Sequence, residues 1–159
     1  MTDPVETPSL TDALVELSFL LQAKLARLAS EYELSLTQVR LLGILRDREP
    51  GIVELAGALD LDKSSVSGLV DRAQRRGLVE RASSKSTDGR AIRVLLTPRG
   101  RAMARQFGER VANELGELVK DLSPAQRERL ARQAAQIVTS SGMADRLEPP
   151  RPLPSHRQR

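Results

Sequence analysis

The chain has 159 residues, of which 40% are apolar and 29% are charged, and this composition indicates a globular protein long enough to bury a hydrophobic core. It has no cysteine, and its one histidine, His156, lies in a proline-rich tail, which excludes disulfide frameworks, thiolate zinc sites and imidazole-based catalysis or metal binding. The most apolar stretch, residues 17–21, is far shorter than the roughly 20 residues that cross a bilayer. The acidic N-terminus lacks the pattern of a secretory signal, so we expect a cytoplasmic protein that uses no cofactor.

The net charge of +4 is distributed unevenly along the chain. Residues 1–62 hold 5 basic and 11 acidic side chains (−6), residues 63–101 hold 10 and 3 (+7), and residues 102–159 hold 10 and 7 (+3). A basic middle segment beside an acidic one predicts that a polyanion would bind at one place on the surface.

The N-terminal third begins with a short arm and continues as a long helix. Residues 1–8 contain two prolines and predict a flexible arm. Ser9 and Asp12 are spaced as in a capping box, and leucines then recur at intervals of three or four residues. The leucine positions are Leu10, Leu14, Leu17, Leu21, Leu25 and Leu28. A stripe of this length favours helix packing or a dimer interface over a ligand site.

Three shorter helices are expected next. Thr37 is the predicted N-cap of the first helix, which ends before Pro50, and residues 52–62 form the second. Asp62 is the predicted N-cap of the third, "KSSVSGLVDRAQRR" at residues 63–76, and Gly77 is placed to end it in the left-handed conformation. Two short helices joined by a tight turn are typical of a helix-turn-helix.

The period then changes to that of strands. Residues 78–83 and 91–96 predict a two-stranded hairpin with alternating Ile92, Val94 and Leu96, because Asp88-Gly89 between them is a strong turn signal. Thr97-Pro98 and Ser123-Pro124 predict the starts of two further helices. The basic, proline-rich residues 143–159 are expected to be disordered.

On a helical wheel, residues 63–76 have an apolar face formed by Val66, Leu69, Val70 and Ala73. The opposite face is small near its start and basic near its end, which suits a helix in a major groove, where hydroxyls approach base edges and arginines reach phosphates. Gly68 on this face costs roughly 1 kcal/mol relative to alanine; close approach of another surface explains it, as tolerated drift also would. Asp71 has three interpretations: pairing with Arg75, which we favour, accepting from a cytosine, or orienting an arginine.

The hairpin loop is basic. Lys85 and Arg90 lie near its tip, and an arginine beside a recognition helix can enter the adjacent minor groove. Asp88 would be repelled by DNA unless it pairs with a guanidinium, and such a pair would hold Arg90 extended.

Residues 55–100 resemble the core of the MarR family of winged helix-turn-helix regulators. The motifs that carry the resemblance are "LA" at Leu55-Ala56, "SSVSGLVDR", "GLVER", the Asp-x-Arg pattern at Asp88 and Arg90, and "VLLTPRG". The resemblance implies a mainly α fold with a small β-hairpin wing, in which residues 33–97 form the DNA-binding region and residues 9–32 and 98–142 form helical dimerisation regions.

The resemblance also implies a function. Most members are homodimeric repressors on pseudo-palindromic operators. Carried onto this chain, the resemblance places the serines and Gly68 at base edges, Arg72 and Thr37 at phosphates, and Arg90 in the minor groove. With the basic residues noted above, the expected DNA-binding residues are Thr37, Lys63, Ser64, Ser65, Ser67, Gly68, Arg72, Arg75, Lys85, Asp88 and Arg90. Many members release DNA on binding a small phenolic or other lipophilic anion; Phe19, Tyr32 and Arg40 are candidates for lining such a pocket here, and a protein without any effector is the alternative.

Three other functions are alternatives. An enzyme would have to use paired acids such as Glu31 and Glu33 without a histidine, a cysteine or a glycine-rich phosphate loop, and we interpret these acids as solvated surface groups. A nonspecific architectural DNA-binding protein would share the charge but need no small-residue recognition face. A helical protein-interaction module explains the long helices but not the wing.

Overall fold

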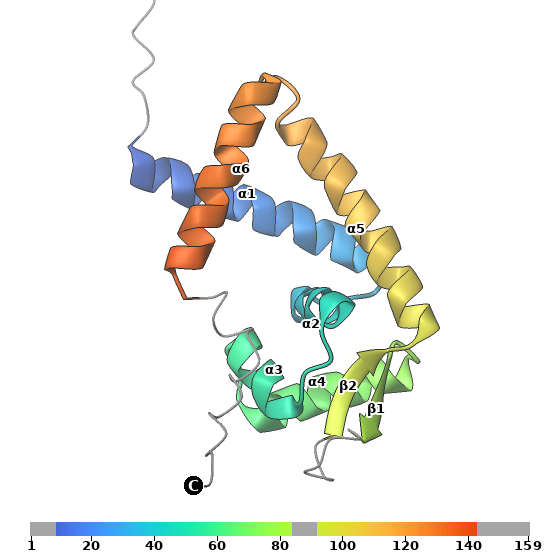
Figure 1. Cartoon of the computed structure of the whole chain (residues 1–159). Helices are drawn as coiled ribbons and strands as arrows, with labels where there is room; N and C mark the ends of the chain where they lie inside the picture. The colour runs from blue at the N-terminus through green and yellow to red at the C-terminus, as the bar shows by residue number, and fades with distance from the viewer. Residues whose placement is uncertain (1–8, 84–91, 143–159) are drawn as a thin grey trace, which may run out of the picture.

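The computed structural model describes residues 9–83 and 92–142, and these ranges form a mainly helical fold with one antiparallel hairpin (Figure 1). The elements in chain order are α1 (Leu10–Glu31), α2 (Leu36–Asp47), α3 (Ile52–Leu59), α4 (Lys63–Arg75), β1 (Val79–Ser83), β2 (Ile92–Leu96), α5 (Pro98–Leu118) and α6 (Pro124–Ser140). The predicted fold class and order of elements are confirmed. The expected arm at residues 1–8, the wing tip at residues 84–91 and the tail at residues 143–159 lie outside the described residues.

Most helices begin at the residues predicted from the sequence. Ser9, Asp62, Thr97 and Ser123 are N-caps, each with a side-chain oxygen that accepts from a backbone N–H in the first turn. The prediction for Thr37 was wrong, because Ser35 is the N-cap of α2. Ser35 Oγ accepts from the Gln38 N–H at 3.2 Å and Gln38 Oε1 accepts from the Ser35 N–H at 2.9 Å, so this reciprocal capping box fixes the start two residues earlier.

A tight corner joins α4, the hairpin and α5. Gly77 has a φ of +68°, as expected for the residue that ends α4 in the left-handed conformation. Thr97 Oγ1 donates to the Gly77 carbonyl at 2.7 Å. A Cβ placed on Gly100 would lie 1.9 Å from the Leu78 carbonyl oxygen, so only glycine lets the first turn of α5 pack this closely against the start of β1.

Only part of the apolar row of the hairpin is buried in the core. Val79 pairs with Leu96 and Ser83 pairs with Ile92 across the two strands. The predicted alternation is present in β2, with Val94 and Leu96 buried, but Ile92 is 53% exposed, so the buried part of the row ends at Val94. Ile92 lies at the outer end of β2, opposite Ser83 and beyond the reach of the core. The Val94 N–H donates to the Pro50 carbonyl at 2.9 Å and so joins β2 to the loop before α3.

The hydrophobic core lies mainly between α2, α3, α4 and the hairpin, which together we call the winged-helix lobe. Its buried side chains include Leu41, Leu55, Val66, Val70 and Val94. The C-terminal end of α1 and Phe107 of α5 also join this core. In contrast, α6 has no buried residue.

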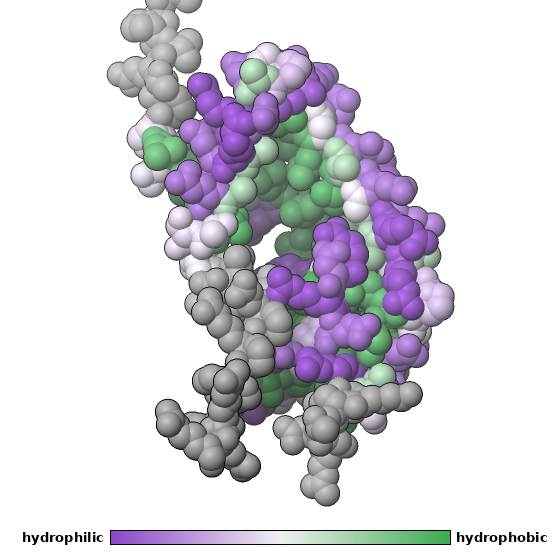
Figure 2. Space-filling model, viewed as in Figure 1, coloured by the Kyte–Doolittle hydropathy of each residue, from purple (hydrophilic) through white to green (hydrophobic). Residues whose placement is uncertain are grey.

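The three long helices surround an apolar hollow. In Figure 1, α1, α5 and α6 form an open triangle on one side of the winged-helix lobe. Figure 2 shows apolar residues gathered inside this hollow and hydrophilic residues along the outer side of α5. Within the described residues, no helix is both long and apolar enough to cross a membrane.

Candidate nucleic-acid interface

The fourth helix has the two faces that its sequence predicts. Val66, Leu69, Val70 and Ala73 are buried against the core. Lys63, Ser64, Ser65, Arg72 and Arg75 are exposed, whereas Ser67 and Gly68 are half-buried. The helix therefore presents small polar side chains near its N-terminus and two arginines near its C-terminus.

A carboxylate organises the first turn of α4. Asp62 accepts from the Ser65 N–H at 2.8 Å, from Ser64 Oγ at 2.5 Å and from Ser65 Oγ at 2.6 Å. These hydrogen bonds, led by the one from Ser64, hold the pKa of the Asp62 carboxyl far below its usual range. Both serine hydroxyls are thus committed to an ionised N-cap.

Gly68 is not required by the packing of the protein itself. A Cβ at this position would meet only Arg72 Nη1, at 3.4 Å, which is an ordinary contact with the end of a flexible side chain. The backbone of α4 is regular here, so the core does not explain why the helix carries glycine. Both explanations above, close approach of another surface and tolerated drift, agree with this observation.

The partner of Asp71 differs from the favoured prediction. Arg81 of β1, and not Arg75, donates to Asp71 Oδ1 at 2.7 Å, and it also donates to Gln74 Oε1 at 2.6 Å. Pairing of Asp71 with Arg75 was therefore wrong, because the hairpin brings a second guanidinium to the same helix from ten residues away. This pair connects the wing strand to α4.

The arginines of this region fall into two groups. Arg76 donates to the Glu33 carbonyl at 2.6 Å and to the Tyr32 carbonyl at 3.1 Å, and Arg93 pairs with Glu54 at 2.8 Å. Among the described residues, Lys63, Arg72 and Arg75 form no ion pair. The uncompensated positive charge of α4 thus lies on its exposed face, where a polyanion can reach it.

The remaining predicted contacts lie elsewhere. Thr37 is half-buried in the first turn of α2, and no hydrogen bond joins its side chain to α4 in the described ranges. Lys85, Asp88 and Arg90 fall outside the described residues. The part of the chain that the structure describes also contains no group of three acidic or histidine side chains that could hold a metal ion.

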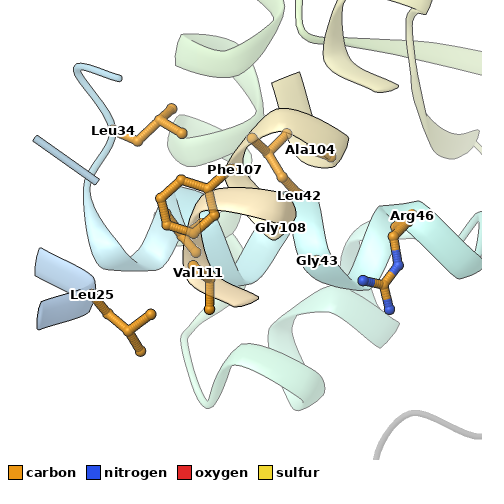
Figure 3. Close-up of a pocket in the computed structure, with 10 residues that line it drawn as sticks. Leu25, Leu34, Leu42, Gly43, Arg46, Ala104, Phe107, Gly108 and Val111 are labelled. Atoms are coloured by element: carbon orange, nitrogen blue, oxygen red, sulfur yellow. The ribbon is translucent and has the colours of Figure 1, made fainter. Parts of the chain in front are cut away.

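A separate apolar pocket lies between α1, α2 and α5 (Figure 3). It encloses about 190 Å³ and is lined by Leu25, Leu34, Val39, Leu42, Gly43, Arg46, Ala104, Phe107, Gly108 and Val111. Arg46 is the one charged residue among them. Its guanidinium pairs with Asp47 at 2.7 Å, and this hydrogen-bonded pair lowers the pKa of the Asp47 carboxyl.

The residues predicted to line a pocket do not line this one. Phe19 is 66% exposed on α1. Arg40 donates to the carbonyls of Ala58 and Leu59, at 3.4 Å each. Tyr32 packs edge-on against Phe107, with ring centroids 5.6 Å apart, and so supports the lining from behind. Phe107 and Val111, four residues apart on the apolar side of α5, are the sequence signal that could have predicted the pocket lining.

Comparisons with known proteins agree with this arrangement. Residues 32–91 match the model of the MarR family. No curated protein sequence matches the chain. The structure is similar to that of RV1404 from Mycobacterium tuberculosis, with a TM-score of 0.72, 29% identity and coverage of 92% of this chain and 99% of the other.

Two further solved structures are similar over a slightly smaller part of this chain. Wild-type MarR from E. coli in its apo form has a TM-score of 0.68 and 24% identity, covering 84% of this chain and 99% of that one. The MarR family protein RV2887 from Mycobacterium tuberculosis, in complex with salicylic acid, has a TM-score of 0.65 and 21% identity, with coverage of 84% and 99%. The resemblance to the MarR family is therefore confirmed.

Proposed function

We propose that this chain, which has the fold of a MarR-family transcription regulator, is a sequence-specific DNA-binding repressor that acts as a homodimer. The observation that carries the proposal is the exposed face of α4. It combines small side chains in the first turn with Lys63, Arg72 and Arg75, whose charges are not neutralised by described neighbours. Such a face is suited to base edges at one end and phosphates at the other.

The proposed contacts divide by groove. Ser64, Ser65, Ser67 and Gly68 face the major groove, and Lys63, Arg72 and Arg75 meet phosphates, as does Thr37 from α2. Arg90 enters the adjacent minor groove with Asp88 as its brace, and Lys85 adds charge at the wing tip. The Asp71–Arg81 pair supports this division, since it joins the wing strand to the recognition helix.

The dimer is proposed to form through residues 9–32 and 98–142. Several large apolar side chains of α1 and α6 are exposed in the protomer: Leu10, Leu14, Leu17, Phe19, Leu130, Ile137 and Val138. Large exposed apolar side chains gathered on two helices are typical of an interface. Two-fold symmetry would then place the half-sites about 10 base pairs, or a multiple of that, apart.

We further propose that the apolar pocket takes a small lipophilic or phenolic anion that releases the protein from DNA. RV2887, which shares the fold, is known in complex with salicylic acid. Here an aromatic ring would lie against Phe107 and Val111, and the ligand's carboxylate would replace Asp47 as the partner of Arg46. On this proposal the protein works in the cytoplasm, without enzymatic activity or a cofactor.

The experiment that tests the proposal compares two duplexes at two salt concentrations. One duplex comes from the region upstream of the protein's own gene and the other has a random sequence. A specific regulator binds the first duplex more tightly at both salt concentrations, whereas phosphate contacts alone give equal binding that falls with salt. Equal binding would favour an architectural DNA-binding protein, and no binding would favour a protein-interaction module.

A further inference from the structure

The hydroxyl groups of Ser64 and Ser65 are oriented by a residue that precedes the recognition helix. A serine hydroxyl has one proton to donate and two lone pairs that accept. Ser64 Oγ donates its proton to Asp62 Oδ1 at 2.5 Å, and Ser65 Oγ donates its proton to Asp62 Oδ2 at 2.6 Å. Both exposed oxygens therefore present only lone pairs to the surroundings.

The orientation is stable because Asp62 remains a carboxylate. The two hydroxyls and the Ser65 N–H hold its pKa far below the usual range, so it does not become a donor at physiological pH. Hydrogen bonds to an ionised acceptor are also shorter and stronger than those between neutral groups.

A cap alone does not require this charge. Serine, threonine and asparagine cap helices about as well as aspartate, and the other N-caps on helix starts of this chain are Ser9, Ser35, Thr97 and Ser123, with Gly51 at α3. A carboxylate here adds a negative charge to the surface that is proposed to meet a polyanion. The charge has a role if the carboxylate is needed to orient the two serine hydroxyls.

We infer that Asp62 sets the base preference of the recognition helix, as a positioning residue that makes Ser64 and Ser65 hydrogen-bond acceptors. This inference rests on the proposed function. In the major groove the donors are the amino groups of cytosine and adenine, whereas guanine O6 and N7 and thymine O4 accept. The first turn of α4 therefore selects cytosine or adenine on the strand that it faces and disfavours guanine or thymine there.

The test is selection of bound duplexes from a randomised library by the full-length protein and by Asp62→Asn. Asparagine keeps the helix cap, but its amide NH₂ donates to a serine oxygen and frees a serine proton to point outward. At the positions read by the first turn, we expect the preference for cytosine or adenine to fall by about 5- to 10-fold, in line with the loss of one or two base contacts. Ser123→Asn, which changes the cap of α6, is the matched control and should select the wild-type motif.

A second background separates action through the serines from direct action. In Ser64→Ala/Ser65→Ala, the further change Asp62→Asn should leave the base preference unaltered, because no hydroxyl remains to be oriented. Circular dichroism checks that each variant is folded. If Asp62→Asn selects the wild-type motif as strongly as the wild type does, Asp62 is a cap only and the inference fails while the proposed function stands. If the wild type itself enriches no motif, the proposed function fails and the inference falls with it.

Discussion

The winged-helix lobe and the two terminal helices, α1 and α6, both contain helices with an apolar stripe, but the surroundings of that stripe differ. In the lobe the stripe is covered by the chain itself, so that Val66 and Leu55 have no exposed surface. On the terminal helices it is left open, since Leu10 is 76% and Ile137 is 58% exposed.

The difference shows that a periodic pattern predicts an apolar face but not the molecule that covers it. Helices as short as the eight-residue α3 are stable in the lobe because neighbouring elements bury their inner side. The 17-residue α6 has no such neighbour within residues 9–83 and 92–142, although its stripe is equally regular. We therefore expect the lobe to stay folded in variants that prevent the terminal helices from forming the dimer. The following variants test this contrast.

The largest effect is expected at the corner where the lobe meets α5. Gly100→Ala places a methyl group 1.9 Å from the Leu78 carbonyl oxygen, so strand and helix must separate, and the free energy of unfolding should fall by about 3 kcal/mol. Chemical denaturation measures this. Gly116→Ala, in the same helix with no atom within 4 Å of the new Cβ, is the control and should be neutral or slightly stabilising. Equal denaturation curves for the two variants would show that the corner yields easily.

The next effect should appear in assembly and not in the lobe. Ile137→Asp puts a charge into the open stripe of α6, and loss of the burial of one isoleucine, about 2 kcal/mol per protomer, should raise the dissociation constant of the dimer at least tenfold. Sedimentation at micromolar concentration would detect the monomer. Gln136→Asp adds the same charge to the same helix, away from the apolar stripe, and is the control. A wild-type protein that sediments as a stable folded monomer would contradict the dimer itself.

A smaller effect is expected for DNA affinity, again in one region only. Arg72→Ala removes an unpaired cation from α4 and should weaken binding by about 1 kcal/mol on all sequences alike, with a salt slope lower by about 1. Arg129→Ala removes an exposed cation from α6 and should leave binding unchanged. Fluorescence anisotropy over a series of salt concentrations distinguishes the two variants. Comparable losses in both would mean that DNA also contacts the terminal helices.

The smallest change should follow from an exposed ion pair of the lobe. Asp71→Asn weakens the bond to Arg81, but both side chains are partly exposed, so the free energy of unfolding should fall by no more than about 0.5 kcal/mol. Glu128→Gln, which removes the i,i+4 partner of Arg132 on α6, is the matched variant in the other region. A loss of several kcal/mol for Asp71→Asn in chemical denaturation would mean that the pair holds the hairpin in place.

Features determined by neighbouring residues in the chain could be predicted from the sequence. The caps at Ser9, Asp62, Thr97 and Ser123 depend on hydrogen bonds within one turn, and they were identified correctly. Ser35 and Thr37 are both acceptable cap residues, and the reciprocal bond from Gln38 decides in favour of Ser35.

Features that need a second segment of the chain could not be predicted in the same way. Alternation along β2 does not reveal that the core ends before Ile92, and spacing along α4 cannot show that Arg81 of β1 approaches Asp71. The pocket is assembled from α1, α2 and α5, so its lining, with Arg46 as the charged member, follows from tertiary packing alone. The wing residues stay a prediction.

The hydrogen bonds of Arg76 have a consequence for the spacer between two operator half-sites. Its guanidinium holds the carbonyls of Tyr32 and Glu33 at the end of α1, so the C-terminus of the recognition helix is fixed to the helix proposed to carry the dimer contact. In such a dimer, the length of α1 and the angle at which it crosses its partner would set the distance between the two recognition helices. A DNA site with one extra base pair in its spacer should then be bound more weakly.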